Sequence, residues 1–390
     1  MGLAEQDIAV GGGGISVMLI GATERAPFRL GPAARLRRAL ARQGATNFID
    51  GQAGMPASGT VLLLRGDHVY DETLSAGLVA TRNFVLLDSQ GRAVAAHVPA
   101  MSAEPARAAI AASSGDRQAL IDAGLNVLNA IDLASAQRKK LRTRQPPYIH
   151  SLAELPLGQV EWRMYRAAYK GVTDFVTKFI WPLPAFWVTR LCARRGISPN
   201  MVTLVSLACV IAATWLFAIG WFGIGLVFAW AMAFLDTVDG KLARVTLTSS
   251  TWGEIFDHGI DHIHPPFWWL AWWYGLGGSA GPDNGLQLVA LWIVIGGYVV
   301  GRLQEGIFLW RLKMEMYVWQ RIDSLFRLIT ARRNPNLAIL TGFTLAGRPD
   351  LGFAAMAAWT LASLAFHFVR MGQAFRAKRR DGALHSWMEA

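Results

Sequence analysis

The segment Phe234–Phe267, FLDTVDGKLARVTLTSSTWGEIFDHGIDHIHPPF, contains four aspartates, and they lie between two long uncharged stretches of the chain. Asp236 and Asp239 are three residues apart, and Asp257 and Asp261 are four residues apart. In an α-helix, each of these spacings puts both carboxylates on one face. We therefore expect two adjacent helices whose acidic faces meet around one polar cavity.

The sequence on both sides of this segment is typical of membrane-spanning helices. No Asp, Glu, Lys or Arg occurs in residues 201–235, 262–282, 284–301 or 351–369. An uncharged stretch of about 20 residues is long enough to cross a bilayer as a helix. The six predicted transmembrane helices lie near residues 200–219, 223–244, 253–275, 286–309, 336–348 and 351–371. The fifth, 336–348, is short for a crossing, so we expect its helix to begin earlier, among the preceding arginines.

The chain is basic, with 38 Lys and Arg against 27 Asp and Glu in 390 residues, for a net charge of +11. Basic residues gather on one side of the predicted topology, at Arg190–Arg195, Arg311–Arg333 and Arg376–Arg380. The positive-inside rule then places both chain ends in the cytoplasm. This accounts for the charge without a nucleic-acid partner. We expect an integral protein of the bacterial cytoplasmic (inner) membrane, in contact with membrane lipids.

The chain before the spans divides into a domain and a linker. Residues 1–135 alternate strands and helices, as in a small cytosolic α/β domain. Residues 136–198 are predicted as a basic linker followed by an amphipathic helix, Glu161–Trp181, at the membrane surface. The alternative for this helix is packing on the first domain. The six-helix domain then occupies residues 199–376, and a basic cytosolic tail residues 377–390. The expected strands are Ile15–Ile20, Val61–Asp67 and Asn83–Gly91, and the expected helices Gly31–Gly44, Ser102–Ser113 and Asp116–Ala134.

Four carboxylates around one cavity cannot all remain ionised unless cations neutralise them. Mg²⁺ and Mn²⁺ prefer oxygen ligands, so we expect two such ions at this site. Gly240 and Gly253 lack side chains and leave room for a ligand between the helices. The alternative is that Arg244 and its neighbours neutralise the carboxylates inside the helix bundle.

The pattern Asp236-x2-Asp239-Gly240-x2-Ala243-Arg244-x8-Gly253-x3-Asp257-x3-Asp261 resembles the signature of the CDP-alcohol phosphatidyltransferase family. Ser198–Thr203, SPNMVT, is similar to the Pro-Asn-x-x-Thr sequence that begins the family's first helix, and the resemblance covers about residues 185–375. It implies a transferase of phospholipid biosynthesis, in which an acceptor alcohol displaces CMP from a CDP-linked donor.

The resemblance also implies roles for individual residues. Asp261 would be a metal ligand and the general base. The other metal ligands would be Asp236, Asp239 and Asp257. The nucleotide would contact Asn200, Thr203, Gly240, Ala243, Arg244 and Gly253.

The resemblance implies the type of reaction, and the donor and acceptor have to be inferred from other features. CDP-diacylglycerol is the expected donor, because a site at bilayer depth suits a lipid-tailed substrate. Arg327, Arg332 and Arg333 resemble the basic pocket of family members that use inositol phosphates, although membrane topology or anionic lipid also explains them. A CDP-inositol-type synthase with a polar donor and a non-catalytic cation or lipid transporter remain as alternative functions. Family members are often dimers, so a homodimer is expected.

Histidines and aromatic residues follow the aspartates. His258 and His262 have a spacing that could bind zinc, but both are rotated about 100° from the acidic face, which favours hydrogen bonding or packing. Pro265 and Pro266 are expected to kink or break the helix. The aromatic residues near its end form either an interfacial belt or a packing surface: Trp268, Trp269, Trp272, Trp273 and Tyr274.

The first domain resembles the core of sugar-phosphate nucleotidyltransferases, in which a strand ends in an Asp that holds metal and nucleotide, here Asp67. Some relatives fuse such a domain to a membrane transferase. The Gly-rich turn with its Arg and Lys, expected after the first strand, is replaced by IGATERAPFRLG (Ile20–Gly31). Without that anion-binding turn, we expect a degenerate, scaffolding or substrate-sensing domain. An active cytidylyltransferase is the alternative.

Overall fold

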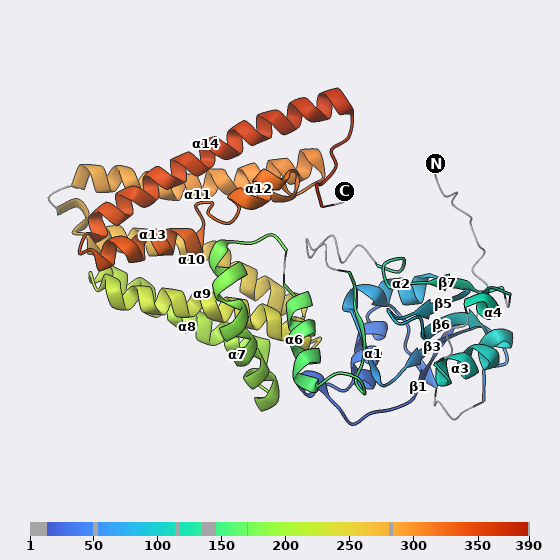
Figure 1. The fold of residues 1–390 in the computed structure, drawn as a ribbon. Helices are drawn as coiled ribbons and strands as arrows, with labels where there is room; N and C mark the ends of the chain where they lie inside the picture. The colour runs from blue at the N-terminus through green and yellow to red at the C-terminus, as the bar shows by residue number, and fades with distance from the viewer. Residues whose placement is uncertain are drawn as a thin grey trace. The chain divides into compact units, whose positions relative to one another are not determined.

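The computed structural model describes residues 14–49, 54–113, 117–122, 124–134, 146–169, 171–280 and 284–388. The chain divides into two compact units. The first comprises Met1–Leu141 and Gln145–Ala167, and the second comprises Arg142–Arg144 and Ala168–Ala390. Among the described residues, the first unit contains the strands and the second is helical (Figure 1).

The first unit is an α/β domain with a six-stranded sheet in the order β2-β1-β3-β6-β5-β7. β1 is parallel to β2 and β3, β6 is antiparallel to β3 and β5, and β5 is parallel to β7. A second, small sheet pairs β4 with β8. The strands are β1 (Ile15–Ile20), β2 (Asn47–Ile49), β3 (Thr60–Arg65), β4 (His68–Tyr70), β5 (Phe84–Leu87), β6 (Ala93–Pro99), β7 (Asn126–Leu128) and β8 (Ile149–Ser151).

Both faces of the six-stranded sheet are covered. Successive side chains of a strand point to opposite faces, so Val17 and Leu62 enter one apolar cluster while Met18 and Leu63 enter the other. This is the layered α/β fold that the sequence predicts. The helices are α1 (Pro32–Ala41), α2 (Ser75–Ala80), α3 (Ala103–Ala111), α4 (Arg117–Asp122) and α6 (Leu157–Ala167), with 3-10 turns η1 (Pro27–Arg29), η2 (Glu72–Leu74) and η3 (Ala100–Ser102).

The helix predicted over Asp116–Ala134 is wrong. α4 ends at Asp122, and Gly124 adopts the left-handed conformation (φ 74°) that commonly terminates a helix. The residues that follow pair with β5 as strand β7. The three predicted strands, the helix closed by Gly44 and the helix near residues 103–111 are confirmed.

The first unit extends beyond the predicted boundary at residue 135. β8 pairs with β4, and α6 buries Val160, Met164 and Tyr165. The buried Glu161 carboxylate accepts a hydrogen bond from the backbone N–H of Phe28 at 3.0 Å. The predicted continuous helix Glu161–Trp181 is therefore wrong, and its first part packs on the first domain, as the alternative proposed. The basic run Arg138–Arg144 lies outside the described residues.

The second unit has a helix at each of the six predicted span positions. Among the described residues, four helices are long and apolar enough to cross a membrane: Pro199–Ala218, Phe222–Val245, Gly285–Leu312 and Pro349–Asp381. α10 and α13 do not meet that standard. The elements are η4 (Val176–Ile180, a π-helix), α7 (Pro182–Arg195), α8 (Pro199–Ala218), α9 (Phe222–Val245), α10 (Thr251–Gly275), η5 (Gly278–Ala280), α11 (Asn284–Leu312), η6 (Met316–Val318), α12 (Arg321–Phe326), α13 (Arg333–Leu345) and α14 (Pro349–Asp381).

Two predictions about these helices concern where α13 begins and whether α10 is interrupted. α13 begins at Arg333, which confirms that its helix starts among the arginines. α10 runs without interruption through Pro265 and Pro266, so the predicted break is wrong. Each proline removes one backbone donor, but its fixed φ matches that of a helix, and Pro265 is buried within the unit.

Trp268, Trp269 and Trp272 are at most 1% exposed and lie in the main apolar cluster of the second unit. The rings of Trp268 and Trp272 pack on Phe217. For these three residues the belt interpretation is wrong and the packing alternative holds, because α10 turns its apolar face towards α8. Tyr274, by contrast, is 66% exposed.

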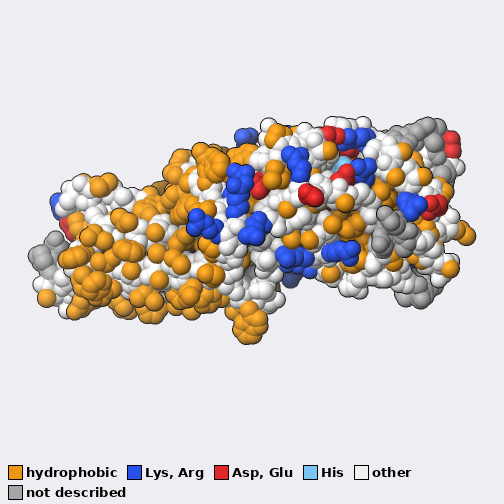
Figure 2. Space-filling model, turned by 90° about the horizontal axis from the view of Figure 1, so that it is seen from below, with side chains coloured by type: hydrophobic (Ala, Val, Ile, Leu, Met, Phe, Trp, Pro, Cys, Tyr) orange, Lys and Arg blue, Asp and Glu red, His pale blue; other side chains and the backbone are white. Residues whose placement is uncertain are grey.

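The outer surface of the second unit is strongly apolar. Figure 2 shows hydrophobic side chains gathered over these helices, and Trp215, Val227 and Trp292 are among those exposed. Patches of this extent are typical of surfaces covered by lipid or by another protein. Phe179 and Trp187, on η4 and α7, are also exposed, and Lys178 and Arg190 lie over their rings. A surface-lying helix therefore stays a prediction for this segment.

Candidate functional site

Three of the four aspartates converge. Asp236 and Asp239 lie one turn apart near the end of α9, and Asp257 lies near the start of α10. One carboxylate oxygen from each lies within 4.8 Å of the others. We call these three residues the Asp cluster. Oxygens gathered this closely suit a hard divalent cation.

Asp239 is the most buried member of the cluster, with 3% of its surface exposed. The Thr203 hydroxyl on α8 donates to Oδ2 of Asp239 at 2.7 Å. Among the described residues, the buried Oδ1 of Asp239 has no hydrogen-bond partner. A buried carboxylate oxygen without a donor is costly unless a cation or water satisfies it. This orphaned oxygen is the observation that fits the cluster to a metal ion.

Asp261 lies outside the Asp cluster and is joined to it by an arginine. The Arg333 guanidinium, at the start of α13, donates through Nη1 to Asp261 at 2.5 Å and through Nη2 to Asp236. The prediction of four converging carboxylates is thus met by three. The alternative of arginine neutralisation applies in part, although Arg333 provides it to Asp236 and Asp261.

The residues expected to bind nucleotide come from three helix ends around the cluster. Asn200 and Thr203 lie in the first turns of α8, and Gly253 in the first turn of α10. A Cβ added to Gly253 would lie 3.1 Å from Oδ1 of Asn200, so a side chain there would crowd the amide. Gly240, Ala243 and Arg244 lie in the last turns of α9, where a Cβ on Gly240 would lie 3.4 Å from the Arg244 guanidinium.

These helix starts are fixed by local capping. Ser198 Oγ accepts from the backbone N–H of Met201 at 3.3 Å, and Ser250 Oγ accepts from that of Gly253 at 3.1 Å. Serine at the N-cap satisfies an otherwise unpaired helix donor. The caps therefore set where α8 and α10 begin, and with that the placement of Asn200 and Gly253.

A cavity of about 800 Å³ within the second unit has Asp261 in its lining, together with charged and apolar side chains. It is lined by the three predicted acceptor residues Arg327, Arg332 and Arg333. Among the described residues, Nε and Nη1 of the Arg327 guanidinium are buried without a hydrogen-bond partner. Guanidinium groups with unused donors suit a bidentate anion such as phosphate. The structure therefore brings the predicted arginines to one cavity.

Sequence reasoning missed other residues that line this cavity. Glu305 of α11 accepts from Arg302 at 3.0 Å and from the Tyr317 hydroxyl at 2.6 Å, and lies 3.5 Å from Arg332. His367 of α14 also lines it. An arginine and a glutamate three residues apart at the end of an apolar span are unusual. That pair was the available signal.

The histidines of α10 divide between the cavity and the core. His258 and His262 line the cavity, with their ring centroids 6.4 Å apart. His262 Nδ1 lies 2.7 Å from the His258 carbonyl oxygen, a contact within the helix. His264 is buried against Trp268. In the described part of the chain, these rings belong to no group of three metal-ligand residues, so a zinc site gains no support.

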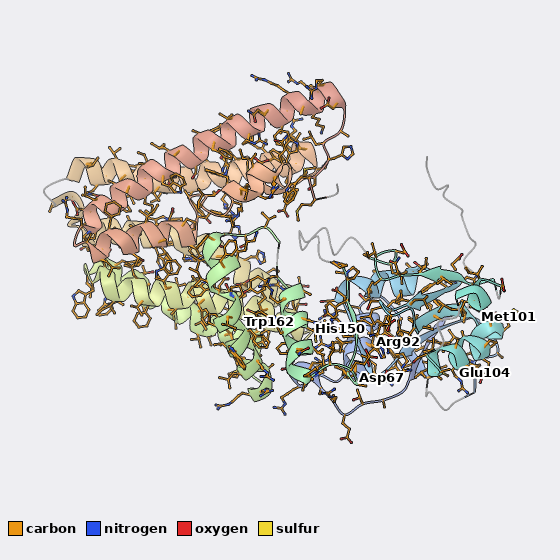
Figure 3. All side chains as sticks on the ribbon, in the orientation of Figure 1. Asp67, Arg92, Met101, Glu104, His150 and Trp162 are labelled. Carbon is orange, nitrogen blue, oxygen red and sulfur yellow. The ribbon has the colours of Figure 1, made fainter. Side chains whose placement is uncertain are left out.

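Asp67, in the first unit, lies beside the turn after β1 (Figure 3): a Cβ on Gly21 would be 3.7 Å from its carboxylate. Arg65 donates to it at 2.5 Å and 2.9 Å, and His68 Nδ1 lies 2.7 Å from it. Partial burial alone would raise the pKa of Asp67, but these two partners hold that pKa below its usual value. The carboxylate is thus already neutralised by its own domain.

The helical part of the chain is similar in sequence to known proteins. Residues 196–331 match the model of the CDP-alcohol phosphatidyltransferase family. Over 134 residues the chain is 35% identical to a phosphatidylinositol phosphate synthase of Streptomyces avermitilis, covering 34% of this chain and 52% of that protein. Over 122 residues it is 28% identical to cholinephosphotransferase 1 of Danio rerio, covering 30% of this chain and 32% of that protein. The chain therefore spans about half, or less, of the length of these curated relatives.

Proposed function

With residues 196–331 forming a CDP-alcohol phosphatidyltransferase domain, we propose that the chain is an integral-membrane transferase of phospholipid synthesis. It moves a phosphatidyl group, or a related phospho-alcohol group, from a CDP-linked donor to an acceptor hydroxyl. The bond between the transferred phosphorus and CMP breaks, a new bond to the acceptor oxygen forms, and CMP leaves. The observation that carries this proposal is the Asp cluster with the orphaned oxygen of Asp239.

Each part of the site has a role in this reaction. Asp236, Asp239 and Asp257 would hold Mg²⁺ or Mn²⁺, which supplies positive charge against the donor pyrophosphate. Asn200, Thr203, Gly240, Ala243, Arg244 and Gly253 would hold the nucleotide, and the Thr203–Asp239 hydrogen bond supports a place for it next to the cluster. Asp261 faces the cavity and would take the proton of the acceptor hydroxyl. Its bond to Arg333 must open for that step.

An apolar pocket supports CDP-diacylglycerol as the donor. It has a volume of about 720 Å³ and lies between α8 and α10, with Leu207, Trp215, Ile255 and Phe267 among its lining residues. It begins four residues after Thr203 on α8 and two residues after Gly253 on α10. A donor whose nucleotide sits at these helix starts would therefore have an apolar surface for its acyl chain directly beside it. A CDP-inositol-type polar donor is the alternative, and it leaves this pocket unexplained.

The arginines of the cavity support an anionic acceptor, such as a phosphorylated polyol of the inositol-phosphate type. Arg302, Arg327, Arg332 and Arg333 line it beside four carboxylates, those of Asp174, Asp261, Glu305 and Glu315. Two donors of Arg327 have no partner among the described residues and would be free to bind an anionic group. The similarity to a phosphatidylinositol phosphate synthase is consistent with this choice. For the first unit, the neutralised Asp67 supports a degenerate domain that scaffolds or senses substrate.

Purified protein with CDP-diacylglycerol, Mg²⁺ or Mn²⁺ and a panel of alcohols tests the proposal. Product mass should show a phosphatidyl ester of a phosphorylated polyol, with CMP released in equal amount. No CMP with any donor and acceptor would instead favour the non-catalytic cation or lipid transporter. Release from CDP-inositol with no release from CDP-diacylglycerol would favour the polar donor.

A further inference from the structure

We propose that Arg333 is a movable counter-ion that links cation binding at the Asp cluster to anion binding in the cavity. The inference rests on the proposed function for its biological meaning. Arg333 lies beyond residue 331, where the segment matched to the family ends.

Arg333 now satisfies two carboxylates at once. Its Nη2 donates to Asp236, a member of the Asp cluster, and its Nη1 donates to Asp261 and lies 3.5 Å from Sδ of Met232. The side chain is 17% exposed. A forked guanidinium between two carboxylates is a strong, directional contact. It joins α9, α10 and α13 at one point.

A divalent cation at the Asp cluster would compete with this contact. Both cations need the Asp236 carboxylate, and positive charges a few ångströms apart repel each other in a partly buried site. Arginine does not lose its proton in proteins. The guanidinium can therefore yield only by moving to another anion.

The cavity offers the place for such an anion. Arg333 lines it together with Arg327 and Arg332, and its buried Nε has no partner among the described residues. A phosphate group held there would accept hydrogen bonds from the Arg333 N–H groups that leave Asp236. An anion in the cavity should then strengthen cation binding at the cluster, and by reciprocity the cation should strengthen anion binding. The same movement would free Asp261.

Arg332, the adjacent residue, provides a matched control. It lines the same cavity and carries the same charge, but it lies 3.5 Å from Glu305 and over the Tyr317 ring, at 5.9 Å from its centroid. Replacing it removes one positive charge near the cluster without removing the bridge to Asp236. A comparison of the two variants separates displacement from long-range charge.

The test measures Mn²⁺ binding by the purified full-length protein, using electron paramagnetic resonance, with and without inorganic phosphate. Without phosphate, Arg333→Gln should bind Mn²⁺ roughly tenfold more tightly than the parent, and Arg332→Gln no more than about threefold. At saturating phosphate, Mn²⁺ binding should strengthen in the parent and in Arg332→Gln, and clearly less in Arg333→Gln. Arg332→Gln should need more phosphate to reach this effect, because it has lost one donor of the cavity. Asp236→Asn should abolish Mn²⁺ binding, which would place the ion at the Asp cluster.

Equal Mn²⁺ affinity in the parent and Arg333→Gln would overturn the proposal. So would equal tightening in Arg332→Gln and Arg333→Gln, which indicates long-range charge alone, or an unchanged phosphate effect in Arg333→Gln. If Arg333→Gln does not fold, Arg333→Lys decides, because it keeps the charge but cannot fork to both carboxylates; it should still bind Mn²⁺ more tightly than the parent. No donor is present and no CMP is measured, so a failed transferase assay and a failed linkage remain distinguishable.

Discussion

In the proposed metal site, the single hydroxyl of Thr203 would prepare a carboxylate for a cation. It donates to Oδ2 of the buried Asp239, whose Oδ1 has no hydrogen-bond partner among the described residues. Thr203→Val keeps the shape and removes this donor. Groups that orient metal ligands typically change metal affinity by about 10- to 100-fold when removed. We expect a loss of Mn²⁺ affinity in that range, measured by titration of the purified protein.

Thr214 is the control for this substitution. It lies on the same helix, α8, and its hydroxyl donates to the Val210 carbonyl at 2.7 Å, away from the cluster. Thr214→Val should leave Mn²⁺ affinity unchanged. If both variants lose affinity equally, the effect belongs to the packing of α8 and the role of Thr203 is refuted.

The cavity arginines make a second prediction at the scale of residues. Arg327→Gln and Arg332→Ala remove donors from the cavity but none from the nucleotide residues. The KM for a phosphorylated acceptor should rise at least about tenfold, as expected for the loss of a charged hydrogen bond worth about 1.5–3 kcal/mol. The KM for the CDP-linked donor should stay within about twofold. Steady-state kinetics with each substrate varied in turn measures both, and equal increases would count against an acceptor site.

The sequence identified the candidate metal-binding aspartates but not the ion pairs that they form. The spacing of the aspartates on α9 and α10 predicted that all four would meet around one cavity, because a helix fixes which residues share a face. Asp236, Asp239 and Asp257 do meet in the Asp cluster, and Asp261 is joined to it by Arg333. Arg333 is 97 residues from Asp236 and 72 from Asp261. A contact of that separation depends on how helices pack, and no local pattern encodes it.

At the scale of elements, the start of α10 lies close to α8. A Cβ on Gly253 would approach Asn200 Oδ1 at 3.1 Å and Ser250 Oγ at 3.2 Å, both tighter than ordinary contacts. Gly253→Ala should therefore displace the Asn200 amide and the Ser250 cap by a few tenths of an ångström where the nucleotide is expected, and raise the donor KM several-fold. Gly285→Ala, on α11, is the control, because a Cβ there meets nothing within 4 Å. A donor KM that rises in neither variant, or equally in both, would contradict this view.

The positions of the apolar helices were easier to predict than the packing of their side chains or the residue at which a helix ends. Long uncharged stretches located α8, α9, α11 and α14, because only apolar helices carry such stretches at that length. The tryptophans of α10 were ambiguous, since aromatic side chains suit both a bilayer interface and a packed core. Likewise, aromatic and basic residues continue from α6 into α7, which hid the end of α6 at Ala167.

For the whole molecule, the unit boundary makes a prediction. A fragment of residues 1–167 should be soluble and unfold cooperatively, because it holds both apolar clusters of its sheet. A fragment ending at residue 135 lacks strand β8, the partner of β4, and the Glu161 carboxylate that accepts from Phe28. It should melt at a clearly lower temperature or aggregate. Circular dichroism during heating compares the two, and equal melting temperatures would place the boundary at 135 after all.

The sequence could not locate this boundary. Strand β8 has three residues, Ile149–Ser151, which is too short for an alternating pattern to be recognised. Its pairing with β4 spans about 80 residues of chain. The α/β character of the first domain followed from local patterns, but its last elements are defined by that distant pairing.

The central claim is that carboxylates of α9 and α10 bind a divalent cation on which transfer from a CDP-linked donor depends. CMP release from CDP-diacylglycerol in the presence of a phosphorylated polyol, with and without Mg²⁺, tests it most directly. Release should require the ion and fall at least about 100-fold in Asp257→Asn, while Asp350→Asn, whose carboxylate pairs with Arg348 instead, keeps the parent rate. CMP release that persists in Asp257→Asn, or that continues with the ion chelated, would contradict the account.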